Sequence, residues 1–156
     1  MRMRVAASVA TVAVYGTLRD PDVRAVVMGA GWRSPGIEGR LDGWRTVFVR
    51  GAAYPGLRRA VGGSATVEIF RAVPVDVLRW LDLFEAEGED YRRHALTVAT
   101  GEGHVEAQVY VPTPRLPLTG VPWHYDAVWR QRHKNAFVRR ARRVMATVSG
   151  RSGSAR

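Results

Sequence analysis

The sequence predicts one mixed α/β domain, in which strands and helices alternate along the chain. Its 156 residues fit a single domain that can bury about 70% of its unfolded surface without a disulfide or metal. Apolar runs rich in β-branched residues alternate with helical periodicity in the order β-α-β-β-β-α-β-β-α. No repeat or linker divides the chain. We therefore expect one domain over residues 1–146 and a disordered tail over residues 147–156.

The first third of the chain predicts a buried strand, a helix and a hairpin. Residues 9–15 are almost all apolar, as in a strand buried on both faces. Asp20 and Pro21 are typical of the N-cap and first position of a helix, which we expect to end at Gly29 or Gly31. An Asp-Gly pair then separates two short apolar runs, and this pair predicts a two-residue hairpin turn.

That hairpin joins strands at residues 36–41 and 44–49. An irregular loop is expected over residues 51–57, because it is rich in turn-forming residues. A glycine pair then opens a third strand at residues 64–71.

The second half predicts one helix, two paired strands and a final helix. Pro74 begins the first helix, which repeats apolar residues at helical spacing and ends near Gly88. Residues 91–100 and 105–111 alternate like paired strands around a glycine-rich turn. Three prolines then predict a stiff connection, and the last helix is expected over residues 125–145.

The composition excludes some chemistry and leaves the role of the positive charge open. There is no cysteine, which excludes thiol catalysis, thiolate metal sites and disulfides. The net charge is +10, and Lys134 is the only lysine beside many arginines. A GC-rich bacterial genome, an anionic ligand or a basic tail would each explain this bias.

The N-terminus and the histidines suggest neither export nor a metal site. The basic start and apolar run resemble a signal peptide, but they lead directly into the first predicted turn without a clear cleavage site. The sequence has no apolar run of 18 residues, so no membrane helix is predicted. The four histidines lack ligand spacing. We expect a cytoplasmic protein that has no metal site and does not associate with membranes.

The first candidate site is the turn at Tyr15, Gly16, Thr17 and Leu18, between the first strand and the first helix. Backbone N–H groups at such a junction point outward and can hold a carboxylate. Gly16 would let a ligand approach the backbone closely. A purely structural strand-to-helix turn is the alternative.

The second candidate is Glu85, near the end of the helix that begins at Pro74. It lies four residues after Leu81 and seven after Leu78, along the edge of the apolar stripe. A glutamate there is either a solvated rim residue or a desolvated general base with a raised pKa.

The last predicted helix mixes aromatic and basic residues, including four arginines between residues 139 and 143. Such a mixture can bind nucleic acid through stacking and phosphate contacts. The alternative is that the aromatic residues pack on the domain and the arginines are solvated. We favour the latter and do not expect nucleic acid as a partner.

Three short motifs together resemble the γ-glutamylcyclotransferase-like superfamily. They are Tyr-Gly-Thr-Leu at 15–18, Leu-Asp-x-x-Glu at 81–85 and Tyr-x-Arg at 91–93. The likeness is greatest to the branch of γ-glutamylamine cyclotransferases and plant avirulence-induced-gene-like (AIG2-like) proteins, and it spans residues 9–130. The family often has glycine after its catalytic glutamate, which would suit Glu87, but the motif spacing favours Glu85.

The resemblance implies a mixed β-barrel flanked by helices, with the active site at one mouth. It implies conversion of a small γ-glutamyl substrate to 5-oxoproline and a free amine, without a cofactor. Glu85 is then the expected catalytic base. The expected substrate-binding residues are Tyr15, Gly16, Thr17, Leu18, Tyr54, Tyr91 and Tyr110.

Two other interpretations stay open at this point. The same fold can serve as a non-catalytic module that binds a small ligand, because fold does not fix function. The basic C-terminal segment can bind an anionic surface or nucleic acid, with salt-dependent affinity. The sequence leaves the leaving group of the substrate and the oligomeric state undetermined.

Overall fold

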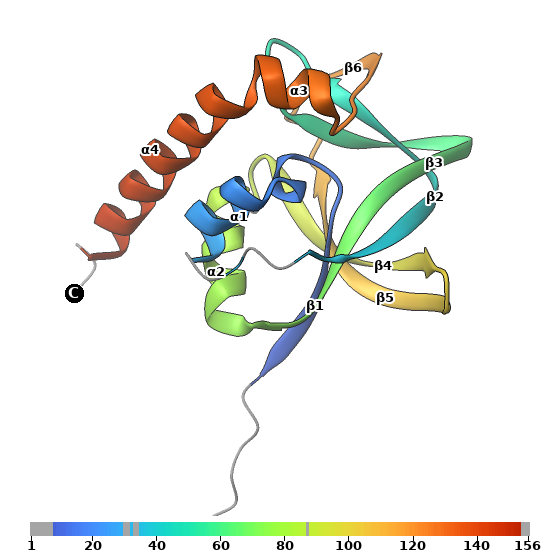
Figure 1. Ribbon diagram of the computed structural model, residues 1–156, viewed down its shortest axis with the longest axis horizontal. Helices are drawn as coiled ribbons and strands as arrows, with labels where there is room; N and C mark the ends of the chain where they lie inside the picture. Colours follow the sequence, from blue (N-terminus) through green and yellow to red (C-terminus); the bar gives the residue numbers. More distant parts are fainter. Residues whose placement is uncertain (1–7, 30–31, 33–34, 87, 154–156) are drawn as a thin grey trace, which may run out of the picture.

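The computed structural model describes residues 8–29, 32, 35–86 and 88–153 of the chain (Figure 1). It is a mixed α/β fold, as the sequence predicts. The strands are β1 (Val9–Val14), β2 (Ile37–Val49), β3 (Pro55–Pro74), β4 (Tyr91–Thr100), β5 (Gly103–Pro112) and β6 (Leu118–Pro122). The helices are the short 3₁₀ turn η1 (Thr17–Arg19), α1 (Pro21–Met28), α2 (Val75–Phe84), α3 (Ala127–Arg132) and α4 (Lys134–Gly153).

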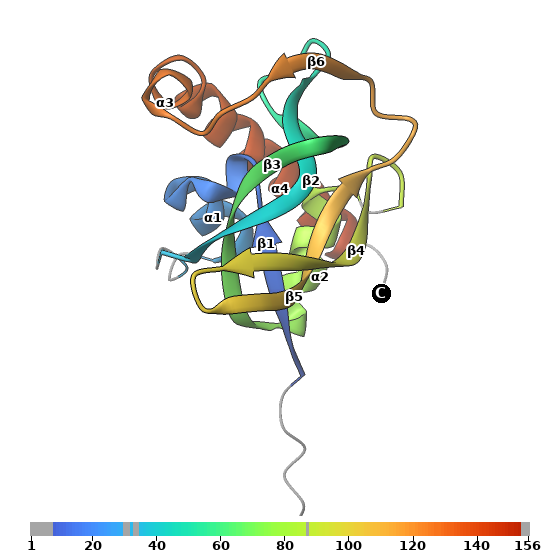
Figure 2. The ribbon, with the colours of Figure 1, turned by 90° about the vertical axis from the view of Figure 1, so that its right-hand side faces the viewer.

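The six strands form one sheet that curls back on itself. Its order is β3-β1-β5-β4-β2-β6, and β2 also pairs with β3, which brings the two sides of the sheet together. β1 is antiparallel to β3 and parallel to β5, so the sheet is mixed. β4 meets β2 through only one residue pair, Arg40 opposite Ala99. The result is a partly closed barrel, whose curvature is visible in Figure 2.

Helices α1, α2 and α4 lie together on one side of the curled sheet (Figure 1). Alternation along β1 supplies two cores, because successive side chains of a strand point to opposite faces. Val12 and Val14 pack in the cluster that contains helix residues such as Leu81, whereas Ala13 packs in the second cluster, with Val109. No helix in the described ranges is long and apolar enough to cross a membrane.

The predicted hairpin at Asp42-Gly43 is wrong. β2 continues through this pair, with Asp42 opposite Ser64 and Trp44 opposite Arg59, and the register shifts between the two pairs. Gly43 has a φ of +87° and permits an irregularity within β2 rather than a chain reversal. The reversal instead occupies residues 50–54, so the loop predicted over 51–57 is shorter and the third predicted strand begins earlier, at Pro55.

The C-terminal part also differs from the prediction in three places. The proline-rich connection contains the additional strand β6, which pairs with β2. The single last helix is two helices, α3 and α4, which meet at His133. Helix α4 then continues to Gly153, so residues 147–153 of the predicted disordered tail are helical.

Candidate active site

A cavity of about 90 Å³ lies where β1 ends and α2 ends. A water needs roughly 10–15 Å³ of such space, so the cavity can hold a small ligand. Its wall contains the expected base and all of the expected substrate-binding residues: Tyr15, Gly16, Thr17, Leu18, Tyr54, Glu85, Tyr91 and Tyr110. The fold therefore brings together segments that are far apart in the sequence, such as the hydrogen-bonded pair Tyr15 and Tyr110, which are 95 residues apart.

The turn after β1 offers unpaired N–H groups to this cavity. Within the described chain, the N–H groups of Gly16, Thr17 and Leu18 donate to no backbone acceptor. A Cβ on Gly16 would lie 2.8 Å from Cγ of Pro55, so the absence of a side chain lets β3 approach the turn. Glycine is needed here for space and not for its backbone angles, since its φ is −120°.

A buried arginine fixes the carbonyl side of the same turn. Arg24 of α1 is 1% exposed, and its Nη1 donates to the carbonyl oxygens of Leu18 at 3.0 Å and Arg19 at 2.8 Å. Its guanidinium also lies 4.9 Å from the centre of the Phe70 ring. Arg24 thus fixes the carbonyl groups of the turn and does not engage its N–H groups. Arg24 could not be recognised from the sequence, because an arginine inside a short helix gives no local signal of burial.

Asp20 ties this region to the C-terminal helices. Its buried carboxylate caps α1 by accepting from the N–H groups of Asp22 and Val23, as the sequence predicts. It also accepts from the hydroxyl of Tyr125 at 2.9 Å and lies 3.2 Å from Nζ of Lys134. One carboxylate therefore joins the start of α1, next to the turn, to the segments that contain α3 and α4.

Glu85 stands at the C-cap of α2 and lines the same cavity as the turn after β1. Its N–H donates to Leu81 at 2.9 Å, and Ala86 then takes a left-handed φ of +48°, which ends the helix. The residue is partly buried. Among the described residues, no hydrogen bond or ion pair engages its carboxylate. Glu87, the alternative base, lies outside the described residues.

Removal from water raises the pKa of Glu85 from its ordinary value of 4.5 to about 8. A second, smaller cause is the negative charge of Asp90, which also lines the cavity. The position at a helix C-terminus acts in the same direction, because the helix dipole disfavours an anion there. A carboxyl group with this pKa can accept a proton near neutral pH, as a general base requires.

The residues of two sequence motifs contact each other and anchor the end of α2. Arg93 donates from Nε to Oδ1 of Asp82 at 2.9 Å, and the hydroxyl of Tyr110 donates to the same oxygen at 2.6 Å. Asp82 lies three residues before Glu85. The pairing therefore fixes this end of α2 against β4 and β5, and explains why aspartate and arginine accompany glutamate and tyrosine in the motifs.

The tyrosine hydroxyls differ in what they can offer a ligand. Tyr15 donates to the carbonyl of Tyr110 at 2.6 Å, and Tyr91 donates to that of Pro55 at 2.9 Å. Burial raises the pKa of the Tyr15, Tyr91 and Tyr110 phenols, so they stay protonated. Their protons are already used within the protein. Among the described residues, no partner is found for the hydroxyl of Tyr54, which is therefore free to donate.

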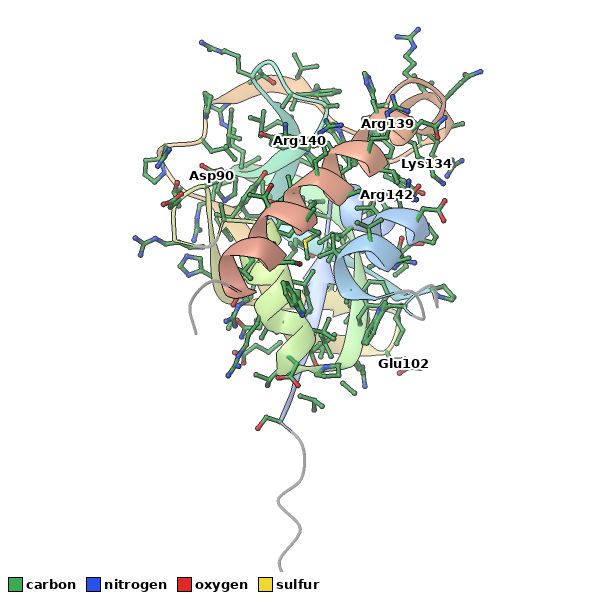
Figure 3. The ribbon with its side chains drawn as sticks, turned by 90° about the vertical axis from the view of Figure 1, so that its left-hand side faces the viewer. Asp90, Glu102, Lys134, Arg139, Arg140 and Arg142 are labelled. Atoms are coloured by element: carbon green, nitrogen blue, oxygen red, sulfur yellow. The ribbon has the colours of Figure 1, made fainter. Side chains whose placement is uncertain are left out.

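Helix α4 adds residues to the wall that were not among the expected site residues. These are Phe137, Arg140 and Val144. Figure 3 labels Arg140 on α4 together with Asp90, which lies in the loop between α2 and β4. The spacing of three and four residues was a usable signal, because it places these side chains on one face of a helix. The sequence does not indicate, however, which part of the domain this face of α4 packs against.

These features define a mixed α/β protein with a cavity that contains a carboxyl group of raised pKa. Among the described residues, no group of histidine, cysteine, aspartate and glutamate is arranged to hold a metal ion. The sequence pattern of the family described as "Gamma-glutamyl cyclotransferase, AIG2-like" matches residues 12–131. The chain therefore belongs to this family, and membership supports a γ-glutamyl cyclotransferase type of function. No curated protein sequence matches the chain.

Solved structures support the fold. A protein of Arabidopsis thaliana, solved in solution, is 23% identical with a TM-score of 0.61, over 92% of this chain and 95% of that one. An AIG2-like protein from mouse is 24% identical with a TM-score of 0.57, over 77% of this chain and 98% of that one. A structure named γ-glutamyl cyclotransferase is 15% identical with a TM-score of 0.59, over 71% and 70% of the two chains.

Proposed function

We propose that the protein converts a γ-glutamyl amine or γ-glutamyl peptide to 5-oxoproline and a free amine, with Glu85 as the general base. The single observation that carries this proposal is the carboxyl group of Glu85, whose pKa is raised to about 8 and which lines the same cavity as the turn at residues 16–18. Family membership supports the reaction class.

The reaction needs no external reactant. The α-amino nitrogen of the glutamyl group attacks its own γ-carbonyl carbon, so a C–N bond forms and closes a five-membered lactam. The bond from that carbon to the leaving nitrogen breaks. Glu85 takes one proton from the α-ammonium group, which makes the amine nucleophilic, and the attacking nitrogen loses a second proton as the lactam forms. Both protons end on the leaving nitrogen, the first through Glu85, so that it departs as an ammonium ion. The products are 5-oxoproline and the released amine.

The cavity supplies groups for the other demands of this reaction. The unpaired N–H groups of residues 16–18 would hold the α-carboxylate of the substrate. The hydroxyl of Tyr54, which has no partner among the described residues, would donate to the carbonyl oxygen as negative charge develops there. Confinement in the cavity would hold the glutamyl group of the substrate in a bent conformation, so that its amine and its γ-carbonyl carbon meet.

The test is release of 5-oxoproline, measured by mass spectrometry, from a panel of γ-glutamyl amines and dipeptides. We expect release by the wild type and a loss of at least about a hundredfold for Glu85→Gln, the range typical of removing a general base. The matched control is Glu89→Gln, an exposed glutamate nearby that does not line the cavity. Full turnover by Glu85→Gln would contradict the mechanism. No turnover of any compound, with binding of 5-oxoproline, would favour a binding module.

A further inference from the structure

Helix α4 completes the cavity although it lies beyond the part of the chain that matches the family. The match ends at residue 131, and α4 begins at Lys134. Phe137, Arg140 and Val144 nevertheless line the cavity with Glu85 and the turn after β1. Phe137 is 6% exposed, and its ring centre lies 6.4 Å from that of Phe84 and 6.3 Å from that of Tyr54. The wall formed by α4 is therefore packed against the site.

Arg140 is the cationic side chain in this wall. Among the described residues that line the cavity, it is the one lysine or arginine, whereas Glu85 and Asp90 are acidic. Its guanidinium lies 5.3 Å from the centre of the Tyr54 ring, within the range of a cation–π contact. No ion pair or hydrogen bond of its guanidinium is found within the described part of the chain. The Tyr54 ring thus positions the positive charge of Arg140 at the cavity without neutralising it.

Burial defines an inner and an outer end of the site. Thr17, Leu18 and Tyr91 are at most 7% exposed, so the turn and its neighbours form the inner end. Arg140, which Figure 3 labels on α4, is exposed, and we take it as the outer end. A substrate whose glutamyl group reaches the turn and Glu85 would direct its leaving part outward, toward Arg140. Asp90 at the same cavity is already near a cation, with Nε of Arg115 at 3.9 Å from its Oδ1.

We propose that Arg140 recognises a carboxylate on the leaving part of the substrate. The preferred substrates are then γ-glutamyl amino acids or peptides, whose leaving part is anionic, rather than γ-glutamyl derivatives of neutral or cationic amines. This proposal rests on the proposed function and names its substrate class. The planar guanidinium suits a carboxylate, because it can donate two parallel hydrogen bonds to the two oxygens.

The experiment compares two ligands that differ in one charge, γ-glutamyl-alanine and γ-glutamyl-alaninamide. The readout is the ratio of their kcat/KM values for the wild type, Arg140→Gln and the control Arg139→Gln. Arg139 is exposed on the same helix and does not line this cavity. We expect Arg140→Gln to lower the ratio about five- to tenfold, as befits a partly solvated ion pair of about 1 kcal/mol. Arg139→Gln should leave the ratio unchanged.

A second readout separates this proposal from the proposed function. Binding of the same two ligands is measured by calorimetry on Glu85→Gln, alone and combined with Arg140→Gln. Tighter binding of γ-glutamyl-alanine than of γ-glutamyl-alaninamide, lost when Arg140 is replaced, would support the proposal. Absence of turnover by the wild type would contradict the proposed function but would leave this binding result valid. The proposal about Arg140 would be overturned if Arg140→Gln weakened the binding of both ligands equally or of neither, or if Glu85→Gln bound neither ligand.

Discussion

At the scale of single residues, the chemistry of the site depends on what surrounds each polar group. Glu85 and Asp82 lie on the same helical segment but have different environments. Asp82 accepts hydrogen bonds from Arg93 and Tyr110, which compensate its charge. Glu85 has no such partner among the described residues, and removal from water raises its pKa to about 8. The same carboxyl chemistry thus gives one anchoring group and one candidate base.

We predict that kcat/KM for a γ-glutamyl substrate rises with pH through an apparent pKa near 8, because Glu85 must be deprotonated to act as a base. Asp90→Asn should shift this apparent pKa downward, since the charge of Asp90 raises it. The shift should be small, because Asp90 is partly exposed and solvent screens its charge. Rate profiles from pH 5 to 10 check this. An unchanged profile in Asp90→Asn would exclude the electrostatic contribution of Asp90.

The same pKa predicts a pH-dependent stability. The folded protein binds the Glu85 proton more tightly than the unfolded chain does, because the folded pKa is about 8 and the ordinary value is 4.5. Stability contributed by this group is therefore fully present below about pH 4.5 and is lost as pH rises through about 8. Relative to Glu85→Gln, the wild type should lose Tm between these pH values. A constant difference in Tm would show that Glu85 titrates normally.

At the scale of elements, the turn after β1 is shaped by its contact with the start of β3. Gly16→Ala would place a Cβ 2.8 Å from Cγ of Pro55, whose ring cannot rotate away. We expect a loss of about 1–3 kcal/mol in the free energy of unfolding, the usual cost of overpacking. Gly120→Ala in β6 is the control, because no atom lies within 4 Å of its added Cβ. Urea denaturation of both variants measures the effect, and equal stabilities would contradict the role of this contact.

Asp20 links α1 to Tyr125, which is far away in the sequence, so replacing Asp20 should remove two stabilising contacts. Asp20→Ala removes the cap of α1 and the acceptor of the Tyr125 hydroxyl. The cap alone is worth about 1 kcal/mol, so the total loss of stability should exceed that amount. Asp126 caps α3 and accepts one hydrogen bond, from the N–H of Trp129. Asp126→Ala should therefore lower the stability by less than Asp20→Ala does. Thermal unfolding checks this order, and a larger loss for Asp126→Ala would contradict it.

At the scale of the whole molecule, α4 belongs to the same core as the barrel and α2. Phe137 and Ala141 of α4 are in the buried cluster that contains Val12 of β1 and Leu81 of α2. Helix α4 therefore covers the site and does not extend from the domain as a separate tail. This arrangement couples the wall of the cavity to global stability.

We therefore predict that α4 unfolds together with the rest of the domain. Phe137→Ala should lower the free energy of unfolding by about 3–5 kcal/mol, the usual cost of truncating a buried phenylalanine. Far- and near-ultraviolet circular dichroism should give coincident transitions. Val128→Ala, at a side chain that is 54% exposed, is the control and should change stability by less than about 0.5 kcal/mol. An early, separate loss of helical signal would contradict the prediction.

The sequence by itself determined the elements with strong local signals and, through the resemblance of its motifs, the part of the cavity wall that contains Glu85 and the turn at residues 15–18. The buried strand β1, the Asp20–Pro21 start of α1 and the paired strands β4 and β5 follow from periodicity and capping. The tertiary structure decided the rest, because the deciding contacts are nonlocal. Asp42-Gly43 became an irregularity within β2, since pairing with β3 on both sides outweighed the local turn preference. Asp82 and Arg140 found their partners Tyr110 and Tyr54 in distant parts of the chain. Arg24 is buried against the ring of Phe70 in the same way, and no local pattern of residues encodes such contacts.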